Sequence, residues 1–246
     1  MALPTAAAPQ CAAQSGEFTA ALVELYTSEG CDSCPPADRW LSGLGRGYPP
    51  GRIVPLSLHV DYRDYIGWKD PYARREFSNR QRKLTQLQKL AFVYTPQVLL
   101  QGKDFRGWAS PAFDEALTRI NARKARAGLE LKITSVMRDR IALEASAEVL
   151  DPTQTGDAAL YLAAYESKLS SVVTAGENRG HTLAHDYVVL EWQGPWEFAS
   201  GPRVTERREL ALLPKAVAAN SGVVAFVQNR RTGEVLQALM LPACPG

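Results

Sequence analysis

The second half of this 246-residue chain consists of short segments in which apolar and polar residues alternate, and this pattern constrains the fold most strongly. About seven such segments follow Gly128, separated by turn-forming stretches such as MRDR, DPTQTGD and NRRTG. Alternation with a period of two places a row of apolar side chains on one face of a strand, and that face must be buried against another layer. Residues 129–246 are therefore predicted to form an all-β, sandwich-like domain.

The first half has a different pattern, in which apolar strands are separated by stretches of helical periodicity. Residues 21–27 and 52–60 are predicted strands, with a helix between them that ends in glycines. Residues 71–90 carry apolar side chains at helical spacing, and two strands around Gly102 follow before a helix that Ser110 can cap. The predicted order is strand, helix, strand, helix, strand, strand, helix.

This change of pattern sets the expected domain organisation. The boundary is placed near the stretch RKARAGLE, around residue 128. We expect an N-terminal arm over residues 1–19, an α/β domain over residues 20–128 and the β domain over residues 129–246. With 46% hydrophobic and 22% charged residues, the chain can bury a sizeable core.

Charge and hydropathy exclude two classes of partner. The net charge is only +2, and no run of basic residues is interleaved with aromatic residues, so we expect no nucleic-acid partner. No apolar run approaches the roughly 20 residues of a membrane-spanning helix, so no membrane span is expected. The first residues, MALPTAAAPQCAAQSGEF, resemble the start of a mature exported chain, which predicts a periplasmic or secreted protein; a cytoplasmic protein with a loose N-terminus is the alternative.

The stretch YTSEGCDSCPPAD places Cys31 and Cys34 between the first predicted strand and the first predicted helix. We expect Cys31 at the N-terminus of that helix, where free backbone N–H groups and the helix dipole favour a thiolate. Cys34 would lie one turn into the helix, close enough to form a disulfide with Cys31. Pro35 and Pro36 suit a first helical turn, because their missing N–H groups would have no intrahelical partner there.

Residues 20–127 resemble the thioredoxin superfamily through the C-x-x-C pair at a helix start and the Thr95-Pro96 pair before a hairpin. The resemblance implies a thioredoxin-like fold, a cis Thr95–Pro96 bond and a position of both residues beside the cysteines, where they help to hold a substrate. The chain departs from the usual Trp-Cys-Gly-Pro-Cys motif with Gly30 before the pair and Asp32-Ser33 inside it, which leaves the direction of redox transfer open.

A narrower resemblance is to an uncharacterised family of secreted bacterial proteins, known only as a domain of unknown function. The stretches that carry it are ELYTSEGCDSCPPAD, HVDYRDYIGWKDPYA, TPQV and GENRGHTLAHDYVV. That family has a thioredoxin-like region and an appended β region, and it implies no particular substrate.

Three interpretations of the cysteine pair are compared. The first is thiol–disulfide exchange with protein or small-molecule thiols and disulfides, which needs no cofactor and assigns no metal ligand. The second is a metal site, although the chain has no second C-x-x-C and only three histidines. The third is an inert structural disulfide in a non-enzymatic binding module. In an oxidising compartment Cys11 and Cys244, near the two ends of the chain, are expected to form a structural disulfide.

Further site residues are predicted around the pair. Glu24, in the first apolar strand, is a candidate proton carrier for Cys34, with a structural hydrogen bond as the alternative. His59, Asp61, Tyr62 and Trp68 follow the second strand, at the edge where ligands collect in open α/β sheets, and are candidate substrate-binding residues. The alternative is a loop that packs its own aromatic residues into the domain.

The stretch GENRGHTLAHDYVV concentrates polar side chains between two strands of the β half. Its candidates are Glu177, Asn178, Arg179, His181 and His185. Loops on a rigid sheet scaffold often carry binding residues, but a polar turn at the surface or at a contact between domains gives the same pattern. The two glycines in the stretch argue against a helix that would bring both histidines to one metal ion.

Overall fold

Alternating apolar residues build the smaller of the two main sheets of the computed structural model, which describes residues 11–244. β6 (Ala127–Val136) and β7 (Arg140–Val149) bury nearly every second residue, and they pair with β1 (Ala12–Gln14) and β12 (Arg203–Ala211) in the order β1-β6-β7-β12. All pairs in this sheet are antiparallel. One face of the sheet is therefore apolar and the other faces solvent.

The larger sheet has eight strands, in the order β14-β13-β8-β11-β3-β2-β4-β5. Their bounds are β2 (Ala21–Thr27), β3 (Ile53–His59), β4 (Gln97–Leu100), β5 (Lys103–Asp104), β8 (Ala158–Glu166), β11 (Val188–Glu197), β13 (Ser221–Asn229) and β14 (Val235–Pro242). The central strands β2, β3, β8 and β13 are buried at every position. They are covered on both faces, which explains why their sequences are almost continuously apolar.

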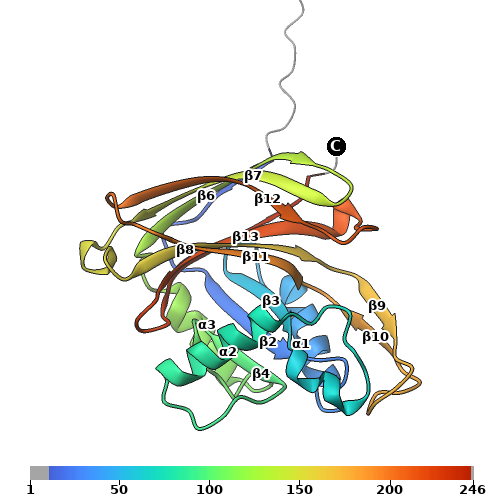
Figure 1. Ribbon diagram of the computed structural model, residues 1–246. Helices are drawn as coiled ribbons and strands as arrows, with labels where there is room; N and C mark the ends of the chain where they lie inside the picture. The colour runs from blue at the N-terminus through green and yellow to red at the C-terminus, as the bar shows by residue number, and fades with distance from the viewer. Residues whose placement is uncertain (1–10, 245–246) are drawn as a thin grey trace, which may run out of the picture.

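The smaller sheet lies above the β8–β13 part of the larger sheet, as Figure 1 shows. A core cluster fills the space between them, with Leu131 and Leu143 from the small sheet and Leu160, Leu162 and Val223 from the large one. The two sheets therefore form a sandwich, and the larger one extends beyond it.

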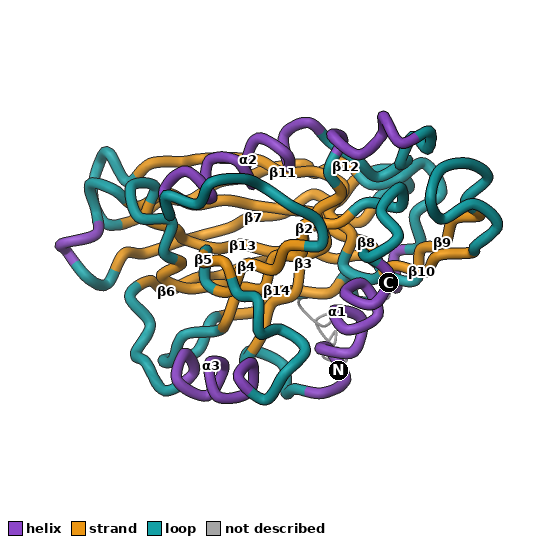
Figure 2. Tube along the Cα trace, turned by 90° about the horizontal axis from the view of Figure 1, so that it is seen from below, coloured by secondary structure: helices purple, strands orange, loops and turns teal. Residues whose placement is uncertain are grey.

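Helices cover the extended part of the large sheet (Figure 2). α1 (Pro35–Gly47) and α3 (Ala112–Asn121) share a core cluster with Val23 and Leu25 of β2. α2 (Arg75–Leu87) packs on the opposite face, where its Phe77 and Leu84 join the cluster of Leu22 and Tyr26. The short helices are η1 (Asp61–Ile66), η2 (Pro152–Gln154) and η3 (Ala218–Asn220), and β9 (Leu169–Val172) pairs with β10 (Thr182–His185) in a separate hairpin.

The predicted fold class, an α/β thioredoxin-like domain followed by an all-β sandwich-like domain, is wrong. The structure is mostly strand, with 42% of residues in strands and 21% in helices, and residues 11–244 show no thioredoxin-like α/β core. β11 from the second half pairs in parallel with β3 from the first half at Val188 and Ser57, so strands of both halves form one sheet. The physical reason is that β3 is buried throughout and needs a neighbour on each edge.

Most individual elements lie close to their predicted positions. The order from β2 to α3 follows the predicted strand and helix order, and each alternating segment after residue 128 contains a strand. α1 begins at Pro35 rather than at Cys31, α2 spans Arg75–Leu87 within the predicted 71–90, and α3 follows Pro111 rather than Ser110. The hairpin β9–β10 and the edge strand β1 were not predicted, because both are short and polar.

A disulfide joins Cys11 to Cys244, as the sequence predicts for an oxidising compartment. Cys11 precedes β1 at the edge of the small sheet, and Cys244 follows β14 at the edge of the large sheet. The bond therefore connects the edges of the two layers. The predicted N-terminal arm spans residues 1–19, of which residues 1–10 lie outside the described part of the chain. From Cys11 onward, the segment belongs to the fold.

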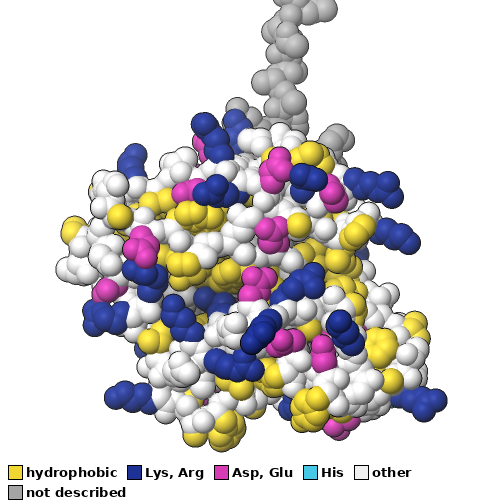
Figure 3. Space-filling view, in the orientation of Figure 1, with side chains coloured by type: hydrophobic (Ala, Val, Ile, Leu, Met, Phe, Trp, Pro, Cys, Tyr) yellow, Lys and Arg dark blue, Asp and Glu magenta, His cyan; other side chains and the backbone are white. Residues whose placement is uncertain are grey.

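The surface seen in Figure 3 carries charges of both signs. Lys and Arg side chains are interspersed with Asp and Glu side chains on this face rather than gathered into one basic patch. Among the helices within residues 11–244, none is long and apolar enough to cross a membrane.

Candidate functional site

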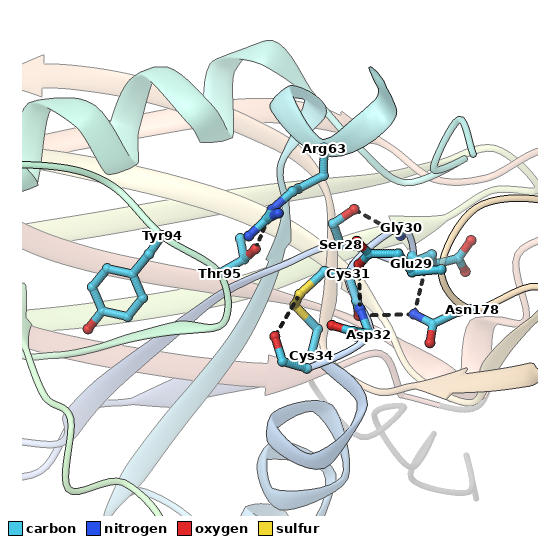
Figure 4. Close-up of a disulfide and its surroundings, with 12 residues drawn as sticks. Ser28, Glu29, Gly30, Cys31, Asp32, Cys34, Arg63, Tyr94, Thr95 and Asn178 are labelled. Atoms are coloured by element: carbon cyan, nitrogen blue, oxygen red, sulfur yellow. Dashed lines mark hydrogen bonds between the residues drawn. A yellow bond between two sulfur atoms is a disulfide. The ribbon is translucent and has the colours of Figure 1, made fainter. Parts of the chain in front are cut away.

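Cys31 and Cys34 form a disulfide in the turn between β2 and α1 (Figure 4). Cys34 is the N-cap residue of α1, and Pro35 and Pro36 occupy the first turn of the helix, as predicted. Cys31 lies in the preceding turn, where its carbonyl accepts a hydrogen bond from the Cys34 N–H at 3.2 Å. The prediction that Cys31 begins the helix is therefore wrong by one turn, and Cys34 is the residue nearest to the helix dipole.

The disulfide lies just beneath the surface. The exposed fractions of Cys31 and Cys34 are 1% and 0%, whereas Asp32 and Ser33 between them are exposed. Ser33 Oγ lies 3.4 Å from Cys31 Sγ. The Cys31 sulfur is therefore separated from solvent by little more than the turn that carries it.

A buried polar network lies next to the disulfide, and its centre is Glu29. The Glu29 N–H donates to Asp70 Oδ2 at 2.8 Å, and the same oxygen lies 2.7 Å from His59 Nδ1. The Glu29 carboxylate accepts a hydrogen bond from Trp68 Nε1 at 2.8 Å and lies 3.1 Å from His185 Nε2. Glu29, Asp70, His59 and His185 are all buried, so these contacts replace the water that their polar atoms would otherwise bind.

The two histidine rings meet edge to face, with centroids 4.9 Å apart. Burial alone would lower the pKa of His59, but the neighbouring carboxylate of Asp70 outweighs it and raises that pKa above its usual value. Burial likewise would raise the pKa of Asp70, but His59 holds it below the usual value. The two shifts favour the charged forms of both His59 and Asp70, whose contact is buried.

Asp38 adds a third buried carboxyl group to this network. It lies four residues after Cys34 in α1, which places it on the same helix face one turn further on. Burial raises the pKa of Asp38, and the nearby histidines His185 and His59 only partly oppose this. Its side chain is thus a buried group that holds a proton more readily than an ordinary aspartate.

The connection between β9 and β10 contributes a clamp from the second half of the chain. Asn178 Nδ2 donates to the carbonyl of Glu29 at 2.8 Å and to the carbonyl of Cys31 at 2.9 Å. The carboxylate of Glu177 accepts a hydrogen bond from the Asp32 N–H at 3.2 Å. Three backbone groups of the cysteine turn, on residues 29, 31 and 32, are therefore bonded to this loop.

Thr95 lies on the other side of the disulfide from Asn178 in Figure 4. The Thr95–Pro96 bond is cis, as the sequence predicts. Arg63 Nε, from η1, donates to Thr95 Oγ1 at 2.9 Å and so links the two loops on that side. Their role in substrate binding stays a prediction.

Glu24 has a partner of its own on the opposite face of the large sheet. It is fully buried, and its Oε1 accepts a hydrogen bond from Arg80 Nε of α2 at 2.6 Å. Arg80 also lies over the Trp192 ring, 4.4 Å from its centroid. Along β2, Glu24 alternates with Val23 and Leu25, which face α1, so the side chain points away from the helix that follows the cysteines.

The residues after β3 divide between two environments. His59 and Trp68 join the Glu29 network, whereas Asp61 bonds Ser78 Oγ of α2 and Tyr62 lies under the Arg82 guanidinium. Their substrate-binding role stays a prediction.

The histidines after β9 also separate. His185 of β10 is buried against Glu29, whereas His181 is exposed in the connecting loop. Within the described part of the chain, no three His, Cys, Asp or Glu side chains are grouped so that they could hold a metal ion.

Glu29, Asp38 and Asp70 are site residues that the sequence interpretation missed. Each lies in a polar stretch that reads as an exposed loop or helix start. The available signal was their spacing: Glu29 precedes the cysteine pair by two residues, and Asp38 follows it by four.

Among the solved structures that resemble this chain are the following two. One is a protein from Agrobacterium tumefaciens that was a structural genomics target, with 23% identity, a TM-score of 0.65, and coverage of 94% of this chain and 98% of that one. The other is HBP35 of Porphyromonas gingivalis, with 16% identity, a TM-score of 0.70, and coverage of 93% and 76%. At these identities the likeness concerns the fold alone.

No curated protein matches the chain. A family model described as "Protein of unknown function (DUF1223)" matches residues 22–228, which confirms the resemblance to a domain of unknown function, while the secretion it implies stays a prediction. The chain therefore belongs to the DUF1223 family of proteins of unknown function.

Proposed function

We propose that this protein carries out thiol–disulfide exchange through Cys31 and Cys34. The observation that carries the proposal is the disulfide between two cysteines three positions apart, immediately before α1 and beside a buried network of ionisable groups. Unpaired N–H groups and the positive end of the helix dipole stabilise a thiolate most strongly at Cys34, the N-cap residue, and less strongly at Cys31 in the preceding turn.

The exchange proceeds in two balanced steps. In the reduced protein the Cys31 thiolate attacks one sulfur of a substrate disulfide, forms a mixed disulfide and releases one substrate thiolate. The Cys34 thiolate then attacks Cys31 Sγ, closes the Cys31–Cys34 bond and releases the second substrate thiolate. The protein is oxidised and the substrate is reduced by two electrons; the reverse sequence oxidises a substrate dithiol.

The second step requires Cys34 to lose a proton, and Asp38 is the nearest candidate acceptor along the helix. Its side chain is buried, its Oδ1 has no hydrogen-bond partner among residues 11–244, and burial raises its pKa. His59 Nε2 and His185 Nδ1 are also buried without a hydrogen-bond partner in this part of the chain. This assignment replaces Glu24, whose carboxylate pairs with Arg80.

Substrates are proposed to be protein or small-molecule thiols and disulfides. Thr95 lies beside the disulfide in Figure 4, and Arg63, which donates to Thr95 Oγ1, supplies a positive charge there. Two disulfides are typical of proteins in oxidising compartments, which supports a periplasmic or secreted location.

The alternative is a non-enzymatic binding module in which the Cys31–Cys34 bond is structural. It is favoured by the burial of both sulfurs, which limits the access that a substrate needs. The two functions differ in whether the bond opens in the folded protein.

A trapping experiment separates them. The variant Cys34→Ser cannot complete the second step, so after reaction with a disulfide-bonded peptide it should accumulate a mixed disulfide at Cys31, visible as a mass increase that reductant reverses. The double variant with Cys31→Ser is the control and should gain no mass. Absence of the adduct from Cys34→Ser would reject exchange and leave the binding module.

A further inference from the structure

We propose that Asn178 is a positioning residue that fixes the main chain of the cysteine turn and thereby sets the reduction potential of the Cys31–Cys34 disulfide. The inference rests on the proposed function for its biological meaning, but it concerns a property of the disulfide that can be measured without any substrate.

The contacts of Asn178 are directed at the backbone of the turn. One side-chain amide donates to two carbonyls, those of Glu29 and Cys31, at 2.8 and 2.9 Å, and Asn178 is only 6% exposed. A buried carbonyl that loses its hydrogen-bond donor gains no water in its place. Each bond therefore opposes a change in the main-chain conformation of the turn. No other natural side chain of this size offers two N–H donors from one atom without a charge.

The loop that carries Asn178 is itself held in place. His185, at the end of β10, contacts the carboxylate of Glu29, and Glu177 accepts from the Asp32 N–H. Gly176 has a φ of +72°, and a Cβ there would lie 3.2 Å from the Cβ of Trp68, so glycine allows the loop to approach the residue that bonds Glu29. The clamp is therefore anchored on both sides of the asparagine.

This arrangement has a consequence for redox equilibrium. The bonds hold residues 29–31 in the conformation in which Cys31 and Cys34 have a Cα–Cα distance of 5.4 Å, the geometry of the closed disulfide. A turn that is fixed before the bond forms loses less conformational entropy when it closes. Asn178 should therefore favour the disulfide over the dithiol.

The test is equilibration of the protein with glutathione redox buffers, with the fraction of the Cys31–Cys34 disulfide read by mass spectrometry after thiol blocking. Asn178→Ala should lower the equilibrium constant for disulfide formation about tenfold, a shift of about 30 mV toward easier reduction. Asn121→Ala is the matched control, because Asn121 Nδ2 also donates to two backbone carbonyls, those of Thr19 and Arg52, both at 2.9 Å. The control should change the constant less than twofold.

A second measurement separates positioning from general destabilisation. Urea unfolding of the oxidised and reduced forms should show that Asn178→Ala destabilises the oxidised form more, whereas a merely structural role would destabilise both equally. If this variant does not fold, Asn178→Ser retains one donor and should give a smaller shift of the same sign. Three results would overturn the proposal: an equilibrium constant for disulfide formation in Asn178→Ala within twofold of the wild-type value, an equal change of that constant in Asn121→Ala, or equal destabilisation of the oxidised and reduced forms by Asn178→Ala. A shift in Asn178→Ala without a trapped mixed disulfide in Cys34→Ser would support positioning and reject exchange.

Discussion

The Cys11–Cys244 disulfide should contribute far more to stability than the Cys31–Cys34 disulfide. The two bonded residues of the terminal pair are 233 positions apart, against 3 for the inner pair. The chain-entropy relation gives about 5.5 kcal/mol for the long loop and about 2 kcal/mol for the short one, because the restriction on the unfolded chain grows with the logarithm of loop length. Native-state strain and residual structure in the unfolded chain reduce such values, so half of each is a reasonable lower bound.

The perturbation is Cys11→Ser together with Cys244→Ser, two partly exposed positions at which serine adds no buried polar group. For a chain of this size each kcal/mol corresponds to about 2–4 °C in Tm, so the variant should melt about 6–20 °C below the wild type in scanning calorimetry. Hydrogen exchange should accelerate first in β1, since Cys11 borders that edge strand.

The comparison variant is Cys31→Ala with Cys34→Ala, which opens the short loop and removes two buried sulfurs. The free energy of unfolding that this variant loses through chain entropy should be at most about half of the loss in the terminal variant. A change in Tm of less than about 3 °C for the terminal variant, or no change in hydrogen exchange at β1, would refute the reasoning.

Two further predictions concern buried charges. Arg80→Met should lower the free energy of unfolding by about 3–5 kcal/mol in urea titration, because it leaves the buried Glu24 carboxylate unpaired, and adding Glu24→Gln should recover part of that loss; no recovery would contradict the pairing. Burial opposes the charged form of His59, but the Asp70 carboxylate raises the pKa of His59 above 6.5, and His59 lowers the pKa of Asp70 below 3.8. The stabilisation by this pair is therefore present between about pH 4 and about pH 6.5 and is lost as the pH rises through the pKa of His59 in the folded state. Wild-type stability should fall over that window, and His59→Gln should flatten the profile; an unchanged profile would show that another group titrates there.

Local features of the fold could be predicted from the sequence. The strands after residue 128 follow from alternation, and the start of α1 near the cysteines follows from the two prolines. The pairing of Cys11 with Cys244, which the structure contains, is the pairing expected from the sequence if the compartment is oxidising. The strands and the helix start depend on residues that are adjacent in sequence, and the cysteine pairing has few alternatives in a chain with four cysteines.

The arrangement of the sheets could not be predicted in this way. The pairing of β3 with β11 joins residues far apart in sequence, and both strands are apolar enough to suit several neighbours. An apolar strand shows that it is buried but does not identify the strand beside it. The predicted fold class, a thioredoxin-like α/β domain followed by an all-β domain, is wrong at this point.

Contacts between residues far apart in sequence also determine the candidate site and could not be predicted. Glu29 and Asp70 are polar residues in loops, where exposure is the usual expectation, and they are buried because each meets a histidine from another element. Asn178 was noted as polar, but its two bonds to the cysteine turn depend on the hairpin that the sequence did not predict.

The central claim is that the Cys31–Cys34 disulfide opens and closes in the folded protein while the Cys11–Cys244 disulfide stays closed. The most direct measurement is a redox titration of the wild-type protein, with each pair followed by peptide mass mapping after thiol blocking. The account predicts one two-electron transition of Cys31–Cys34 with a midpoint between about −120 and −270 mV, the range of redox-active pairs, and a terminal pair that remains oxidised throughout. A Cys31–Cys34 pair that resists reduction to below about −300 mV, as structural disulfides do, would contradict it.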